Sequence, residues 1–165
     1  MSKPWVLIIM GSDSDAEVMS QAAAALDEAG IPYEMTVASA HRSPERTQRV
    51  IRDAEANGAA VFIAGAGMAA HLPGVVASLT TKPVIGVPLA SGALNGVDAL
   101  YAIVQMPPGI PVATVAIGGA RNAGVLAAQI IATSDADLAA RLNAQRSAMA
   151  DAVTTKSKKV EKSTR

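Results

Sequence analysis

The chain has 165 residues, half of them apolar, and its formal net charge at pH 7 is zero. This length fits one domain with a sizeable core, which Ala, Val, Ile and Gly must build because there are only one Trp, one Phe and two Tyr. Cysteine is absent, which excludes disulfide bonds and thiolate chemistry, and no apolar run approaches the ~18 residues of a membrane span.

Apolar runs typical of buried strands alternate along the chain with Ala-rich stretches typical of helices. The pattern predicts strands at residues 5–10, 35–38, 60–64, 84–87 and 112–117. It predicts helices at residues 15–29, 44–57, 72–78, 95–104, 122–132 and 135–154. Strands that are apolar on both faces belong to a parallel sheet covered by helices on both sides. The sequence therefore predicts a three-layer α/β/α domain, in which ligands bind at the carboxyl ends of the strands.

The loop after the first predicted strand, residues 11–15 (GSDSD), has features of a ligand site. Gly11 permits a tight turn, and the following helix start offers backbone N–H groups to an anion. Ser14 and Glu17 form a capping-box pattern, so the alternative is that the polar side chains of this loop only cap the helix. Without a Walker lysine or a G-x-G-x-x-G pattern, neither a P-loop nor a dinucleotide site is supported.

The loop after the second predicted strand, residues 39–44 (SAHRSP), is the most informative one. His41 is one of only two histidines, and histidine is the side chain that exchanges protons most readily near neutral pH. Arg42 beside it is suited to grip a phosphate group. The alternative is a surface histidine without a chemical role.

The loop after the third predicted strand, residues 64–74 (AGAGMAAHLPG), contains the second histidine, His71. Its small residues serve either tight packing or a close approach of the backbone to a ligand. If the second and third strands are neighbours in the sheet, His41 and His71 converge. Two histidines without cysteine or convergent carboxylates make a poor metal site, so acid–base and hydrogen-bonding chemistry is expected and no metal.

A proline-rich loop, residues 106–111 (MPPGIP), cannot be helical. Such a stiffened loop would cover a site, contact a neighbouring subunit or serve as a plain connector. The sequence leaves these three alternatives open.

Several of these segments together resemble the N5-carboxyaminoimidazole ribonucleotide mutase family. The resemblance covers about residues 5–142 and rests on residues 11–15, 39–44, 65–74, 96–101, 104–112 and 122–123, in matching order and spacing. It implies a flavodoxin-like fold and a homo-octamer with sites at subunit junctions. It also implies a reaction of purine biosynthesis that moves a carboxylate from the exocyclic N5 nitrogen to ring carbon C4, without metal or organic cofactor. A cytoplasmic protein is expected on other grounds, since the apolar run at residues 5–10 is too short for a signal peptide and no membrane span is present.

The resemblance also implies the roles of individual residues. His41 would be the general acid–base, and the remaining positions would bind the ribonucleotide substrate. The ribose-phosphate binders would be Ser12, Asp15 and Arg42. The cradle for the imidazole and its carboxylate would be the backbone of Ser39 and Ala40 together with Gly67, Met68, His71 and Leu72. Many relatives have Gly where this chain has Met68, which would narrow the pocket or repack it, and the segment 118–122, with Arg121, is shorter than is common.

Three other functions compete with this one. The related aminoimidazole ribonucleotide carboxylase would take carbon dioxide directly from solution. A non-catalytic phosphoribosyl-binding module would keep Ser12, Asp15 and Arg42 but would not need His41. A purely structural, oligomer-forming protein would explain the Ala-rich surfaces but not the polar cluster at the strand ends.

The last residues, 154–165, contain five basic side chains against one acidic side chain, Glu161. They are predicted to form a disordered, solvated tail after a single catalytic domain at residues 1–153. The rest of the chain is acidic and almost lacks stacking aromatics, which argues against nucleic acid as a partner. The expected partners are a small-molecule ribonucleotide and further copies of the chain, with no membrane.

Overall fold

A parallel five-stranded sheet forms the centre of the computed structural model, which describes residues 3–163 of the chain. The strands are β1 (Trp5–Met10), β2 (Tyr33–Val37), β3 (Ala59–Gly67), β4 (Val84–Leu89) and β5 (Ala113–Thr114). They lie in the order β2-β1-β3-β4-β5, and every neighbouring pair is parallel. The carboxyl ends of all the strands therefore meet at one edge of the sheet.

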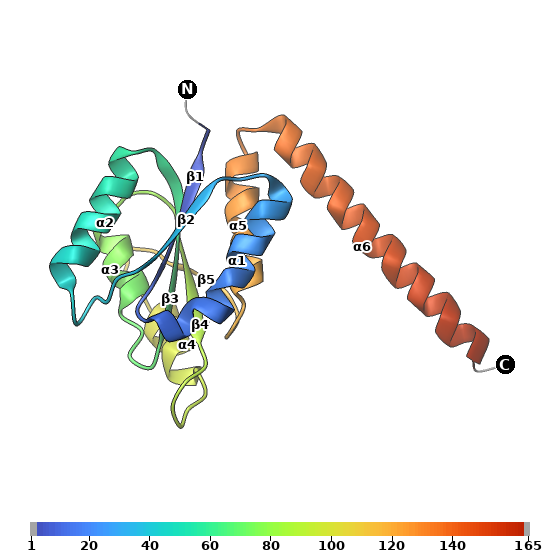
Figure 1. Cartoon of the computed structure of the whole chain (residues 1–165). Coiled ribbons are helices and arrows are strands. Elements are labelled where there is room, and N and C mark those ends of the chain that lie inside the picture. The colour runs from blue at the N-terminus through green and yellow to red at the C-terminus, as the bar shows by residue number, and fades with distance from the viewer. Residues whose placement is uncertain (1–2, 164–165) are drawn as a thin grey trace.

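Helices cover both faces of this sheet (Figure 1). In chain order they are the 3₁₀ turn η1 (Asp13–Asp15), α1 (Ala16–Ala29), α2 (Pro44–Ala56), α3 (Leu72–Leu79), α4 (Val97–Val104), α5 (Ala120–Ala132) and α6 (Ala136–Ser163). One core cluster joins the sheet to α1 and α5, and a second joins it to α2, α3 and α4. The predicted three-layer α/β/α architecture is confirmed.

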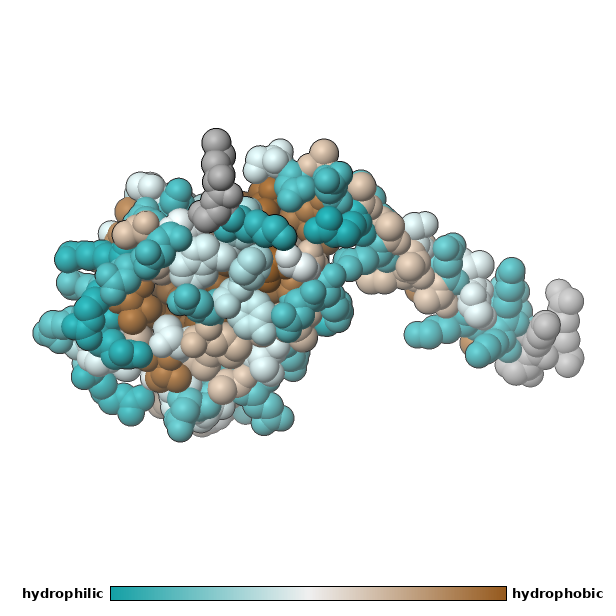
Figure 2. Space-filling model, turned by 45° about the horizontal axis from the view of Figure 1, so that its top comes forward, coloured by the Kyte–Doolittle hydropathy of each residue, from teal (hydrophilic) through white to brown (hydrophobic). Residues whose placement is uncertain are grey.

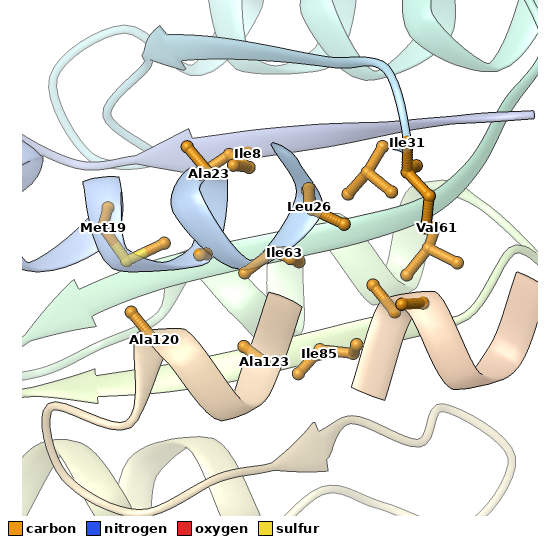
Figure 3. Packing of buried hydrophobic residues seen from close by; sticks show 14 of the residues in the cluster. Ile8, Met19, Ala23, Leu26, Ile31, Val61, Ile63, Ile85, Ala120 and Ala123 are labelled. Atoms are coloured by element: carbon orange, nitrogen blue, oxygen red, sulfur yellow. The ribbon is translucent and has the colours of Figure 1, made fainter. Parts of the chain in front are cut away.

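Small side chains let the layers come close together. In Figure 3, Ile8, Ile63 and Ile85 from three strands lie in one cluster with Leu26 of α1 and Ala123 of α5. All five residues are buried, with at most a few per cent of their surface exposed. Alanine and glycine residues lie between α1 and α5, so the backbones of these two helices approach each other closely.

Gly124 of α5 is a sensitive point of this packing. A Cβ atom at Gly124 would lie 2.5 Å from the carbonyl oxygen of Ala22 in α1, so a larger side chain must push the helices apart. We expect Gly124→Val to lower the free energy of unfolding by about 1–3 kcal/mol, the usual cost of overpacking. Asn122→Val places the same side chain at an exposed position of the same helix and is the control. Equal melting temperatures for the two variants would contradict this account.

The edge strand β5 is shorter than expected, because only Ala113 and Thr114 join the ladder instead of residues 112–117. Pro88 of β4 lies where the next ladder bond would form, and proline has no N–H to donate. The chain continues beside β4 without regular pairing, and the N–H of Gly118 donates to the carbonyl of Pro88 at 2.8 Å.

The C-terminal segment differs from the predicted disordered tail. Helix α6 starts on the domain, where Leu138 is buried in the core, and continues through the segment expected to be irregular as far as Ser163. Figures 1 and 2 show α6 projecting away from the domain, with hydrophilic side chains between its apolar ones. Local propensity favours the Ala-rich first part of this helix, whereas residues 154–163 contain no Ala and include five Thr, Ser or Val residues, which are weaker helix formers.

The outer part of α6 is expected to be dispensable. Every residue from 152 to 161 is exposed, so truncation after Asp151 removes little that contributes to the core. We expect the truncated protein to keep kcat/KM, measured by product absorbance, and its native mass, measured by light scattering. A smaller assembly after truncation would show that this part of α6 packs against a neighbouring copy.

Candidate active site

The loops that follow β1, β2 and β3 surround a cavity of about 550 Å³ at the carboxyl edge of the sheet. All ten residues predicted as site residues line it: Ser12, Asp15, Ser39, Ala40, His41, Arg42, Gly67, Met68, His71 and Leu72. The lining also includes Ala69 and Ala70, which lie within the predicted cradle loop from Gly67 to Leu72, and four residues that were not predicted as site residues: Gly11, Ser14, Ala66 and Ser91. The structure thus brings the three predicted loops into one site.

The two histidines meet although their strands are not neighbours. The expectation that the second and third strands pair directly is wrong, because β1 lies between β2 and β3. The loops after β2 and β3 nevertheless approach each other at the carboxyl edge of the sheet. His41 Nε2 lies 2.6 Å from His71 Nδ1, with the ring centres 4.8 Å apart and the ring planes at 76°.

The contact between His41 and His71 restricts which of their two facing ring nitrogens carries a proton. At hydrogen-bond distance one ring nitrogen must carry the proton and the other must accept it, so both nitrogens cannot be protonated while the bond persists. A histidine whose orientation is fixed by a second polar group has the arrangement of an acid–base catalyst.

The first loop is built differently from its predicted cap. The capping box is formed by Ser12 and Asp15, not by Ser14 and Glu17, because η1 adds a short turn before α1. The Asp15 carboxylate accepts the N–H of Ser12 at 3.2 Å, and the Ser12 hydroxyl accepts the N–H of Ser14 at 3.4 Å. Both side chains predicted to bind ribose-phosphate therefore also hold the shape of their own loop.

Burial raises the pKa of the Asp15 carboxyl above its ordinary value, and the hydrogen bond from Ser12 offsets this only in part. Since folding favours the protonated form, the stability that this group contributes is present below the ordinary value of 3.8 and is lost as the pH rises through the folded pKa. Asp15→Asn keeps an acceptor for the N–H of Ser12 and removes the charge.

We therefore expect Asp15→Asn to unfold at a higher temperature than the parent protein at neutral pH, and this gain should vanish in acid. Thermal unfolding of both proteins across the acidic to neutral range is the measurement. Melting temperatures that change in parallel with pH would contradict the role of the buried carboxylate.

The second loop is a self-bonded turn. The N–H of Ser39 donates to Ser43 Oγ, which in turn donates to the carbonyl of Ser39, both at 3.2 Å. The N–H of Arg42 donates to the Ser39 hydroxyl at 3.2 Å, and Arg42 Nη2 donates to the carbonyl of Gly11 at 3.3 Å. Arg42 thereby joins the first two loops. A guanidinium has five N–H donors, so this bond leaves donors for an anion.

The third loop has an unusual backbone. Met68 and Ala70 have φ values of 54° and 40°, the left-handed region that residues with a side chain rarely adopt. The Met68 side chain lines the cavity but is 60% exposed, so it lies at the rim, whereas Leu72 is buried at the start of α3. A Cβ atom at Gly67 would lie 2.7 Å from Ser91 Oγ, so a larger residue here would displace the Ser91 side chain.

The residues missed by the sequence reasoning had a recognisable signal. Ser91 follows β4, so the same search of strand ends that selected His41 and His71 would have selected it. Gly11 and Ser14 belong to the first loop that was selected, and Ala66 belongs to the third.

A larger hollow of about 770 Å³ lies away from this site. It is lined by residues 77–84 and by Gly109, Ile110, Pro111 and Ala113, with Glu55 at its border. The proline-rich loop borders this hollow and lines no part of the histidine cavity, so the alternative that it covers the site within one chain is wrong.

Two further features concern residues 3–163. Among them, no group of three or more His, Cys, Asp or Glu side chains comes together as a set of metal ligands. Within the same part of the chain, no helix is long and apolar enough to cross a membrane.

Fold and site together define a flavodoxin-like α/β protein with a histidine pair at the carboxyl edge of its sheet. The AIR carboxylase family profile matches residues 5–152. The chain is 55% identical to the N5-carboxyaminoimidazole ribonucleotide mutase of Pyrococcus horikoshii, over 96% of this chain and 90% of that protein. It is 53% identical to the mutase of Thermotoga maritima, over 96% of this chain and 92% of that protein. It is also 52% identical to the phosphoribosylaminoimidazole carboxylase of Schizosaccharomyces pombe, over 98% of this chain but 29% of that protein.

The crystal structure of Treponema denticola PurE superimposes with a TM-score of 0.88 at 30% identity, covering 95% of this chain and 98% of that one. The chain belongs to the AIR carboxylase family.

Proposed function

We propose that the chain is an isomerase of de novo purine biosynthesis that converts N5-carboxyaminoimidazole ribonucleotide into 4-carboxy-5-aminoimidazole ribonucleotide. The observation that carries this proposal is the contact of His41 with His71 in a cavity that all ten predicted residues line. The identity to relatives of similar length that are named as this mutase supports the same reaction.

The reaction needs one acid–base group and a closed space. The bond between N5 and the carboxylate breaks, which leaves the aminoimidazole ribonucleotide and carbon dioxide together in the cavity. Ring carbon C4 then attacks carbon dioxide, His41 removes the C4 proton, and N5 regains a proton, so the atoms balance. The electron-rich ring supplies the electrons for the new bond. Ideal orientation of two reactants lowers an activation barrier by ~7–11 kcal/mol, and confinement in the cavity is expected to provide several kcal/mol of this.

The remaining residues hold the substrate in this scheme. Arg42 binds the 5′-phosphate, while Ser12 and Asp15 bind the ribose. The imidazole and its carboxylate lie against Ala40 and the loop from Gly67 to Leu72. The N–H of Ser39 is already bonded to Ser43, so the Ser39 backbone shapes the turn more than it serves as a donor.

Carboxylation of the unmodified ribonucleotide by free carbon dioxide is the less favoured alternative. The relative named as a carboxylase is a much longer protein, of which this chain spans 29%. The bacterial and archaeal relatives that match along most of their own length are named as mutases.

The protein works, in this proposal, in the cytoplasm as a homo-octamer with sites at subunit junctions. The loop after β4, which contributes Ser91 to the cavity, and the following helix α4 expose four large apolar side chains: Leu94, Val97, Tyr101 and Val104. An apolar surface of this kind is typical of a protein interface. The expected native mass, by light scattering, is that of eight chains.

The direct test is incubation of the purified protein with N5-carboxyaminoimidazole ribonucleotide while the absorbance of the C-carboxylated product is followed. Product should form without added metal or cofactor and faster than in a protein-free control in the same buffer. A rate equal to that of the control would refute the proposed function.

A further inference from the structure

We propose that Arg46 is a positioning residue for the histidine pair, because it fixes the free edge of β2 where the chain turns into the loop of His41 and Arg42. Arg46 lines no part of the cavity. Its effect on the reaction rests on the proposed function, whereas its effect on the geometry of the loop does not.

The loop after β2 needs such support more than the other two loops. Strands β1 and β3 each have a neighbouring strand on both sides, but β2 is an edge strand that pairs only with β1. The N–H of Ala38 donates to the carbonyl of Met10, so this residue faces β1. Because successive residues of a strand point their backbone groups to opposite sides, the carbonyl of Val37 faces the free edge.

Arg46 occupies this free edge from the first turn of α2. Its Nε donates to the carbonyl of Val37 at 3.1 Å, and its Nη2 donates to Thr36 Oγ1 at 3.2 Å. A planar guanidinium holds two such acceptors in a fixed relation, which an ammonium group cannot do. The last two residues of β2 are thereby fixed to the helix that follows the loop.

The other end of the loop is held by the same helix. The carbonyl of Ser43 accepts the N–H and the hydroxyl of Thr47, a fully buried side chain of α2. Residues 38–42 thus run between two points that are both anchored on α2. Four residues into this segment, His41 must place Nε2 within hydrogen-bond distance of His71, so a small shift at Val37 moves the acid–base group.

The experiment compares Arg46→Ala and Arg46→Lys with Arg49→Ala, which removes the same charge from an exposed position of the same helix. We expect Arg46→Ala to lower kcat/KM about 10- to 100-fold, the range that misplacement by about 1 Å produces. Arg46→Lys should remain impaired, since lysine restores the charge but not the paired donors. Arg49→Ala should match the parent protein, and all variants should keep its melting temperature.

A second readout needs no substrate. The chain has only two histidines, so the ring nitrogen and proton signals in an NMR spectrum report His41 and His71 directly. Arg46→Ala should shift or broaden these signals, and Arg49→Ala should leave them unchanged. Unchanged ring signals in Arg46→Ala, full rescue by Arg46→Lys, or an equal effect of Arg49→Ala would each overturn the proposal. If the parent protein proves inactive, the ring signals still test the positioning role.

Discussion

Replacement of His41 by Asn is expected to lower kcat at least ~100-fold, the loss typical of removing a general acid–base group. Asparagine is close to histidine in size and keeps hydrogen-bonding capacity toward His71, so the loop should retain its shape. It cannot take up a proton from ring carbon C4. Steady-state turnover of the N5-carboxylated ribonucleotide is the measurement.

The control for this variant is binding of the substrate and thermal unfolding. A dissociation constant and a melting temperature close to those of the parent protein would assign the loss to the chemical step. Near-normal turnover in His41→Asn would refute the assignment of His41 as the acid–base group, even if the protein proved to be a mutase.

Removal of the Arg42 side chain is expected to act on binding instead. Deleting a hydrogen bond to a charged group costs roughly 1.5–3 kcal/mol, which is about 10- to 150-fold in affinity. Isothermal titration with the ribonucleotide measures it.

The dephosphorylated nucleoside separates phosphate binding from other roles of Arg42. Parent protein and Arg42→Ala should bind the nucleoside about equally, because the group that Arg42 recognises is missing from it. An equal loss of affinity for nucleoside and nucleotide would show that Arg42 recognises another part of the substrate.

The fold and the site loops could be predicted because each depends on local patterns. Uniformly apolar runs mark strands buried on both faces, and parallel strands collect their carboxyl ends at one edge. The loops with Ser12 and His71 follow such strands, and the loop with His41 follows β2, an edge strand without a fully buried residue, so all three could be expected at one edge of the sheet. The roles of the individual residues came from the resemblance and not from these patterns.

Other features depend on contacts between segments distant in sequence. Strand order is one, since no local signal shows that β1 separates β2 from β3. The early end of β5 depends on which residues of β4 face it, and only the hydrogen bond from Gly118 reveals that Pro88 does. The role of Arg46 depends on which side of β2 lacks a neighbour. The sequence therefore predicts which residues form the site better than it predicts the contacts that fix their positions.

Transfer of the carboxyl carbon within the cavity is the central claim, and a single-turnover label experiment tests it most directly. The substrate carries isotopically labelled carbon in its N5 carboxylate, and unlabelled bicarbonate is added in excess. If carbon dioxide is released and recaptured in the cavity of His41 and His71, the label should remain predominantly in the C4 carboxylate of the product. Complete exchange of the label with bicarbonate in one turnover would contradict this account and indicate a carboxylase that uses free carbon dioxide.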